Sequence, residues 1–366
     1  MNIIRPTLIL DETVCRNNIR RMVQKAAKLG VRFRPHFKTH QSVKVGEWFR
    51  EEGVTAITVS SVQMAEYFAA AGWKDITIAF PLNILEMENI NSLTKSAVKI
   101  NVLVENTEVV HFLQEQLVAP VDVWLKIDTG YNRTGIEATD FELVDAVIKA
   151  TTYSAKTNLK GFLTHSGQTY QANSIDEIMR RHFDSLLKLK NLKNRYAGMY
   201  GNLEISMGDT PAASVCENFN GVDELRPGNF VFYDLMQQNH GVCRFEDIAV
   251  KMVCPVVAIH PSRNEVVIHG GAVHFSKDYI LNTDGKKMFG RIIIEKEGKK
   301  VLMDTMNYLS ALSQEHGILK VAQSQLLHFY VGQLVEIYPV HSCLTANLMG
   351  HYYTTTGERI EMMPKF

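Results

Sequence analysis

Eight short β-rich runs alternate with helical patterns between residues 31 and 228, and this alternation constrains the fold more than any other feature of the chain. Alternating strands and helices are typical of a parallel sheet whose outside is covered by helices. Eight such units predict an α/β architecture closed into a (β/α)8 barrel. The runs cover residues 31–37, 55–61, 75–80, 99–105, 121–128, 158–165, 202–208 and 222–228.

The segments between the runs carry apolar residues at helical spacing, which suits them to cover the outside of a sheet. One such segment contains Val62, Ala65, Phe68 and Ala69, and another contains Phe141, Val144, Val147 and Ile148. An open doubly wound sheet is the alternative arrangement. No GxGxxG motif follows the first run to support it.

After about residue 240 the pattern changes to β-rich runs without long helices between them, punctuated by Gly, Pro and Asn. This pattern predicts a mostly antiparallel C-terminal β domain, with which residues 7–12, TLILDE, are expected to pair. A chain of 366 residues also exceeds the size at which single cores stop growing. We therefore expect a barrel over residues 13–240 and a β-rich domain from residues 1–12 and 241–366.

The charge balance and the cysteines indicate the binding partners and the cellular compartment of the protein. Lys+Arg and Asp+Glu are both 39, so no global field attracts nucleic acid or an anionic membrane. No apolar stretch approaches the roughly 18 residues that span a bilayer, and no signal peptide is expected. Five cysteines without a CxxC pair fit reduced thiols. These features predict a cytoplasmic protein that binds neither nucleic acid nor membrane.

Polar side chains follow several of the predicted strands, at the edge where barrel active sites gather. Lys38 ends the first strand, between His36 and His40. Among other cations the neutral amine of a lysine is favoured, and that amine can form an imine. A solvated surface lysine is the ordinary alternative. The other polar strand ends are residues 128–133, 164–167, 206–210 and 226–229.

The last two strand ends contain Gly208 and Gly228, where backbone N–H groups can approach a phosphate closely. Loops after the seventh and eighth strands are the usual phosphate site of such barrels. A phosphate loop together with a strand-end lysine describes a pyridoxal phosphate site better than a sugar phosphate site.

Several segments resemble one enzyme family. RPHFKTHQ resembles the RPHxKTH segment of the D-threonine aldolase and D-serine dehydratase family, whose lysine carries pyridoxal phosphate, and KIDTGYNRTG and GFLTHSG are similar to segments of the related alanine racemases. ELRPGNFVFYD and HSCLTANL also look like family segments. The resemblance implies that Lys38 forms the imine, that Arg133 lies near the phenolic oxygen, and that Arg226 faces the pyridine nitrogen. It further implies that His165 and Tyr170 contact the ring, and that the phosphate is surrounded by Ser206, Gly208, Asp209, Thr210, Gly228 and Asn229.

His341 and Cys343 form a candidate metal pair. In an extended strand residues i and i+2 point to one side, so both side chains can reach one ion. Sulfur and nitrogen donors favour zinc over manganese or magnesium, and two protein ligands leave the open coordination of a catalytic site. Taken alone, such a pair is more often a buried thiol beside an unrelated histidine. The resemblance implies a metal, because members of the family bind one here. Many of the aldolases have a carboxylate at the position of Cys343, which favours zinc and dehydration in this chain.

Two further polar motifs are left outside the predicted site. His269 and His274 flank HGGAVH, and histidines in turns are commonly structural residues. Glu315 and His316 are similar to a family segment, but their spacing implies no chemistry.

The resemblance implies a homodimeric lyase that uses pyridoxal phosphate and a divalent metal on a β-hydroxy D-amino acid. Dehydration and retro-aldol cleavage both stay open. An amino-acid racemase would need a second base on the opposite face, and a pyridoxal phosphate carrier protein would resemble the barrel alone.

Overall fold

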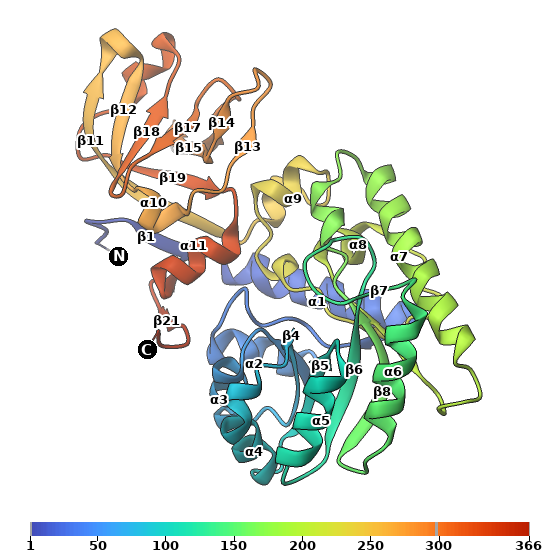
Figure 1. The fold of residues 1–366 in the computed structure, drawn as a ribbon. Coiled ribbons are helices and arrows are strands. Elements are labelled where there is room, and N and C mark those ends of the chain that lie inside the picture. The colour runs from blue at the N-terminus through green and yellow to red at the C-terminus, as the bar shows by residue number, and fades with distance from the viewer. Residues whose placement is uncertain (1, 297–298, 366) are drawn as a thin grey trace. The chain divides into compact units, whose positions relative to one another are not determined.

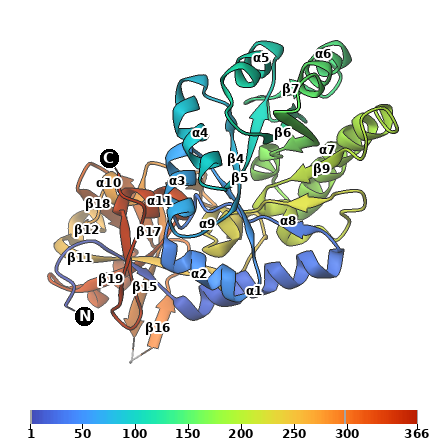
Figure 2. The same cartoon turned by 90° about the horizontal axis from the view of Figure 1, so that it is seen from below.

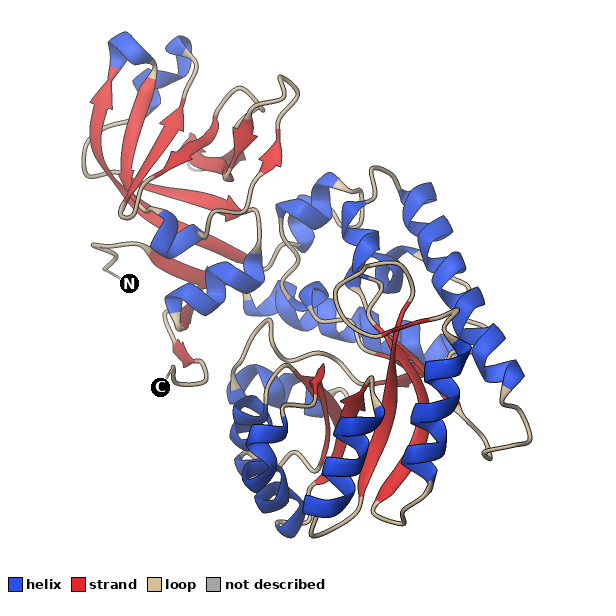
Figure 3. Ribbon diagram, in the orientation of Figure 1, coloured by secondary structure: helices blue, strands red, loops and turns tan. Residues whose placement is uncertain are grey.

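The computed structural model describes residues 2–296 and 299–365, which form two compact units. Unit 1 comprises Met1–Ile19, Thr39–Val45 and Asn229–Phe366. Unit 2 comprises Arg20–Lys38 and Gly46–Gly228. Helices and strands alternate in unit 2, whereas strands dominate unit 1 (Figure 3).

Unit 2 contains eight parallel strands in the order β2-β10-β9-β8-β6-β5-β4-β3. The residues after β2 close the circle, because the N–H of Phe37 donates to Thr58 and the N–H of Thr58 donates to Pro35. The predicted (β/α)8 barrel is therefore confirmed. The strands are β2 (Arg32–Phe33), β3 (Ala56–Val59), β4 (Asp75–Pro81), β5 (Lys99–Val104), β6 (Val121–Asp128), β8 (Thr157–Thr164), β9 (Glu204–Met207) and β10 (Glu224–Leu225), with β7 (Ile136–Glu137) beside β6.

Helices cover the outside of these strands (Figures 1 and 2). The helix α3, for example, turns Val62, Ala65 and Phe68 inward. Side-chain caps begin several of them, such as Ser61 at α3 and Ser174 at α7. The helices are α1 (Glu12–Leu29) and α2 (Val43–Glu51), which both begin in unit 1, then α3 (Val62–Ala70), α4 (Met87–Lys95), α5 (Thr107–Gln116), α6 (Phe141–Thr152), α7 (Ile175–Arg195) and α8 (Thr210–Val215), with 3-10 turns η1 (Ile84–Glu86) and η2 (Gly167–Gln171).

The barrel interior combines apolar packing with one buried ionic network. Leu103, Trp124 and Leu163 pack together with almost no exposed surface. Arg34 is also buried, and its guanidinium donates to Glu224 over 2.7 Å and to Asp75 over 2.6 Å. A buried charge is tolerated only when it is paired in this way.

Unit 1 is built on a mostly antiparallel sheet in the order β12-β18-β17-β15-β19-β11-β1-β20-β21. β1 (Thr7–Leu10) pairs with β11 (Val250–His260) and, in parallel, with β20 (His351–Thr354), so the N-terminal strand joins the C-terminal β domain as expected. The other strands are β12 (Glu265–His269), β13 (Ile280–Leu281), β14 (Lys287–Met288), β15 (Gly290–Lys296), β16 (Lys299–Leu302), β17 (Tyr308–Leu312), β18 (His316–Lys320), β19 (Leu334–Pro339) and β21 (Arg359–Glu361).

Short helices connect the strands of unit 1, and the helices of the described residues are all too short or too polar to cross a bilayer. The helical segments of unit 1 are α9 (Leu235–Asn239), α10 (Ala272–Phe275), α11 (Ser342–Met349), η3 (Asn229–Val231), η4 (Phe245–Asp247), η5 (Pro261–Arg263) and η6 (Gln323–His328).

Candidate active site

Lys38 lies beyond the carboxyl end of β2, in the segment that closes the barrel. Its backbone N–H donates to Nδ1 of His36 over 3.3 Å, and the backbone N–H of His36 donates to the carbonyl of Pro227 over 2.9 Å. The lysine residue itself is exposed. The chain therefore holds Lys38 at the barrel rim with its side chain accessible.

Cations gather around this rim. Burial, together with the positive charges of Lys38 and Arg133, holds the pKa of His165 well below its usual value. Burial and the charge of Lys38 likewise lower the pKa of His36. Lys126 is buried on β6, where burial and Arg226 lower its pKa to about 8. Both histidines are consequently neutral at pH 7, beside an excess of positive charge.

Arg226 is fixed inside the barrel by the ends of neighbouring strands. Its Nε–H donates to Ser206 over 2.7 Å, and a terminal N–H donates to the carbonyl of Thr164. Ser206 donates in turn to Glu224 over 2.8 Å, so this hydroxyl orients the guanidinium. Burial lowers the pKa of Arg226 to about 10, which still leaves it charged at neutral pH.

An aromatic group lies beside these cations. The ring centroid of His165 is 5.7 Å from that of Tyr131 and 6.1 Å from that of Tyr170. The guanidinium of Arg133 lies 5.1 Å from the centre of the Tyr131 ring. Gly167 makes this packing possible, because a Cβ there would lie 2.4 Å from the Tyr131 ring. Since the neutral His165 faces the carbonyl of Gly208 over 2.6 Å, its Nδ1 carries the proton.

The predicted phosphate loop adjoins the first turn of α8. Asp209 caps this helix by accepting the N–H of Ala212 over 2.7 Å, and it also accepts the hydroxyl of Thr169 over 2.9 Å. The N–H of Thr210 donates to the Tyr170 hydroxyl over 3.1 Å. Gly208 lies against the backbone of Arg226, where a Cβ would meet its carbonyl at 2.8 Å. Asp209 thus holds the loop, and burial raises its pKa.

These residues fit pyridoxal phosphate. The rim offers an accessible amine on Lys38, neutral aromatic side chains, and an excess of cations that an anionic cofactor would offset. Ser166 adds a fully buried hydroxyl with no hydrogen-bond partner among the described residues. Gly228 lies two residues after Arg226 and is the last residue of unit 2.

The candidate metal pair lies in unit 1 at the start of α11. β19 ends at Pro339, His341 occupies the N-cap of α11 with extended backbone, and Cys343 lies in the first helical turn. The prediction of an extended strand through residues 341–343 is therefore wrong. The pair nevertheless interacts, because a side-chain hydrogen bond joins His341 to Cys343.

Asp278 orients the imidazole of His341, with Oδ2 at 2.7 Å from Nδ1. Burial disfavours the charged imidazole, but the hydrogen bonds to Asp278 and Cys343 outweigh burial and raise the pKa of His341 to about 11. Nε2 is then the ring nitrogen that a metal would occupy, which is the arrangement of a histidine metal ligand supported by a carboxylate. A metal would take the place of the shared proton.

Polar side chains surround Cys343. Its Sγ lies 3.2 Å from Oγ1 of Thr39 and 3.5 Å from Nδ2 of Asn229. The amide of Asn229 also donates to Asp234 over 2.7 Å, and Asp234 accepts the N–H of Ser342 over 3.0 Å. Asn229, expected near the phosphate, is thus bonded within unit 1 to the residues around the thiol.

Asp278 and Asp234 were not among the residues predicted from the sequence. They lie 63 and 108 positions from their partners His341 and Ser342. No spacing pattern connects residues so far apart, so only the folded structure reveals them.

Comparison with known proteins agrees with both units. Residues 10–235 match the family model described as the alanine racemase N-terminal domain, and residues 249–355 match a putative serine dehydratase domain. The chain belongs to the alanine racemase N-terminal domain family. The first match covers most of the barrel of this family member and the second most of its C-terminal β domain, which confirms the predicted relationship to D-serine dehydratases and D-threonine aldolases.

Individual relatives of this family member are dehydratases and aldolases. It is 28% identical to a D-serine dehydratase of Dictyostelium discoideum, over 98% of this chain and 94% of the relative. It is 30% identical to a D-threo-3-hydroxyaspartate dehydratase of Delftia sp. (strain HT23), over 93% of this chain and 91% of the relative. The solved structure of that Delftia enzyme superposes with a TM-score of 0.90, covering 100% of this chain and 99% of the other. An alanine racemase of Clostridium difficile, 13% identical, shares the fold with a TM-score of 0.67 over 100% of each chain.

Proposed function

We propose that the chain is a lyase that uses pyridoxal phosphate and a divalent metal to dehydrate a β-hydroxy D-amino acid. The observation that carries this proposal is the group of neutral aromatics and cations around Lys38. Two similar dehydratases, matched over more than nine-tenths of this chain, support the reaction class. The product would be a 2-oxo acid and ammonia.

Each side chain at the rim has a role in this reaction. Pyridoxal phosphate, when bound, accepts the electron pair of a bond broken at the substrate Cα. Lys38 would bind the cofactor and, once its amine is free, hold the proton from Cα. Arg226 stays charged at neutral pH, so it donates hydrogen bonds and cannot accept a proton. His165, with its proton held by Gly208, would present a neutral ring.

His341 and Cys343 would hold the metal, which would supply Lewis acidity at the leaving β-hydroxyl. Zinc suits a nitrogen and sulfur donor set better than manganese or magnesium. The similar solved structures include a histidine-to-alanine mutant of a D-threo-3-hydroxyaspartate dehydratase and a cysteine-to-alanine mutant of such an enzyme in the metal-free form.

Retro-aldol cleavage is the second candidate, because a D-threonine aldolase from Arthrobacter sp and two 3-hydroxy-D-aspartate aldolases are also relatives. Cys343 favours dehydration, since the resemblance puts a carboxylate at that position in many aldolases.

We further propose that the enzyme is a homodimer located in the cytoplasm. The five cysteines, all free thiols, are compatible with a reducing compartment.

Borohydride reduction followed by peptide mass spectrometry tests the cofactor site. We expect the reduced cofactor on Lys38, and its loss in Lys38→Ala. Lys126→Met is the matched control, because burial lowers the pKa of Lys126 to about 8 and so makes its amine a competing candidate. A label on Lys126, or one that persists in Lys38→Ala, would contradict the assignment.

The products of D-serine, D-threonine and D-threo-3-hydroxyaspartate decide the reaction. A 2-oxo acid with ammonia supports dehydration, whereas glycine with an aldehyde means aldol cleavage. Inversion without breakdown means a racemase, and an inert but cofactor-loaded protein means a carrier.

A further inference from the structure

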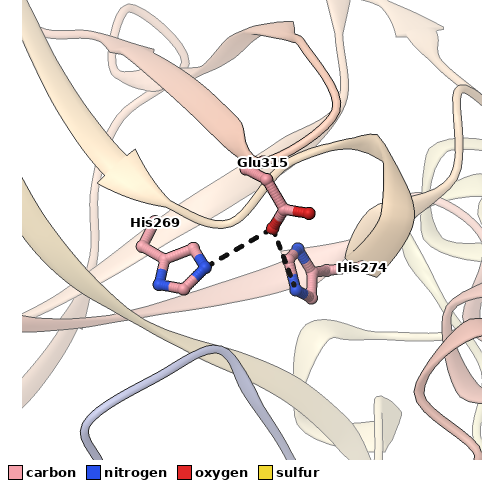
Figure 4. Close-up of side chains that lie close together, drawn as sticks. All are labelled: His269, His274 and Glu315. Atoms are coloured by element: carbon pink, nitrogen blue, oxygen red, sulfur yellow. Dashed lines mark ion pairs between the residues drawn. The ribbon is translucent and has the colours of Figure 1, made fainter.

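Two motifs that the predicted active site does not use come together in unit 1 (Figure 4). His269 ends β12, His274 lies in α10, and Glu315 lies in the turn between β17 and β18. Oε2 of Glu315 is 3.5 Å from Nε2 of His269 and 3.9 Å from Nε2 of His274. All three potential ligand atoms lie within 4.8 Å of one another.

We propose that His269, His274 and Glu315 form a second divalent-cation site of the zinc class, made of different residues from His341 and Cys343. Two imidazole nitrogens and one carboxylate oxygen are a donor set that zinc accepts with a fourth position left open. Neighbouring donors in a tetrahedral zinc site are about 3.4 Å apart, so the two imidazole–carboxylate separations require only small adjustments, whereas the two imidazoles, within 4.8 Å of each other, must move closer. The proposed dehydration does not need this site, and the inference goes beyond that function.

The backbone brings the three side chains together. β12 and β18 pair with His269 opposite His316, and the N–H of Gly270 donates to the carbonyl of Glu315 over 2.9 Å. At Gly271 a Cβ would lie 2.2 Å from the carbonyl oxygen of Gln314. Only glycine allows so close an approach. The segment that carries the histidines is therefore tied to the turn that carries the carboxylate, and the donor positions do not depend on flexible side chains alone.

The distances suit an ion better than direct hydrogen bonds. A good N–H···O bond has a donor–acceptor distance up to about 3.2 Å, which both imidazole–carboxylate distances exceed. The side chains of His269 and Glu315 are 40% and 50% exposed, whereas that of His274 is 15% exposed. An ion can therefore enter from solvent, and the open position is available to water or to a carboxylate.

One hydrogen bond of His274 competes with metal binding. The N–H of Gly271 donates to Nδ1 of His274 over 3.1 Å, so the neutral ring carries its proton on Nε2. A metal on Nε2 requires that proton to move to Nδ1, and the contact with Gly271 to open. Loss of one such bond weakens binding by up to about tenfold. The second site should therefore bind zinc more weakly than a site containing a thiolate.

Equilibrium dialysis of the cofactor-loaded protein against zinc, followed by elemental analysis, tests the proposal. We expect two ions per chain in the wild type. His274→Ala and Glu315→Gln should each weaken the second ion at least tenfold and leave the first in place. His328→Ala, which removes another histidine of unit 1, should keep both ions. His269→Ala adds a variant at a partly exposed side chain in case His274→Ala fails to fold, as judged by circular dichroism and thermal melting.

Two independent readouts separate the sites. Cobalt substituted for zinc gives a thiolate absorption band only at Cys343, so the second ion should bind without adding to that band. Zinc should also shift the ¹⁵N resonances of the His274 ring as its proton moves to Nδ1. One ion per chain in the wild type that His274→Ala and Glu315→Gln both retain would overturn the proposal, as would a second ion that survives the combined loss of His269, His274 and Glu315. One ion per chain that these two variants lose would instead count against the role of His341 and Cys343.

Discussion

Asp278 accepts a hydrogen bond from Nδ1 of His341 over 2.7 Å, so Nε2 is the ring nitrogen that a metal would occupy. Supporting carboxylates of this kind raise the basicity of a histidine ligand and hold its tautomer. Asp278 is therefore a positioning residue for the proposed metal.

Asp278→Asn should lower metal affinity about 10- to 100-fold, because an amide orients the imidazole without supplying the negative charge. Competition with a metal-binding dye measures the affinity, and cofactor absorbance should not change. Asp284→Asn, at an exposed turn of the same unit, is the control. Equal affinities for the two variants would remove Asp278 from this role.

Exhaustive chelation should stop turnover and leave the cofactor bound, because separate residues would hold the metal and the cofactor. Added zinc should restore activity to the wild type and fail to restore it to Cys343→Ser. Cys243→Ser, which changes another thiol of unit 1, should behave as the wild type. Full activity after chelation would exclude a metal from the reaction.

Arg34→Met should destabilise the protein by about 3 kcal/mol at pH 7, since it removes the closest cation from the buried Glu224 and leaves only the longer 3.8 Å pair with Arg32. Burial would raise the pKa of Asp75, but the bond to Arg34 outweighs burial and lowers it. A lowered carboxyl pKa in the folded state stabilises above the unfolded pKa and loses that effect as pH falls through the folded value.

The destabilisation caused by Arg34→Met should therefore shrink as the pH falls below about 4, the ordinary pKa of an aspartate, and through the lowered pKa of Asp75. Urea unfolding at several pH values measures this change. Arg359→Met removes an exposed pair with Glu361 and should cost less than about 1 kcal/mol. A difference between wild type and Arg34→Met that does not vary with pH would show that Asp75 gains nothing from the pair.

Gly167→Ala should cost about 1–3 kcal/mol, because its Cβ would overlap the Tyr131 ring. Part of that cost should disappear when Tyr131 is already alanine. A double-mutant cycle of urea unfolding measures the coupling. Additive effects would mean that the glycine is required for another reason.

The barrel could be predicted because each strand run and each helical stripe carries its own local period. The eighth strand is only Glu224–Leu225, too short for a periodic signal, and the count of units indicated its place. The register of β1 against β11 needed the structure, although the apolar run at residues 7–10 indicated a strand.

The start of α11 could not be predicted for a different physical reason. The β-rich run before it continues to Pro339, and the N–H of Ser342 is then satisfied by Asp234, which lies 108 positions earlier. A tertiary partner thus determines where the helix begins. The pairing of His341 with Asp278 has the same origin, because a contact over 63 positions leaves no trace in local sequence.

The interleaving of the two units has a consequence for how the protein is made. The chain changes unit after residues 19, 38, 45 and 228. β1 precedes the strands of the barrel in the chain, yet its partners β11 and β20 are translated more than two hundred residues after it. The barrel segment can therefore fold before β1 has its sheet partners, and the surroundings of Cys343 are completed only after the strands of unit 1 have been translated.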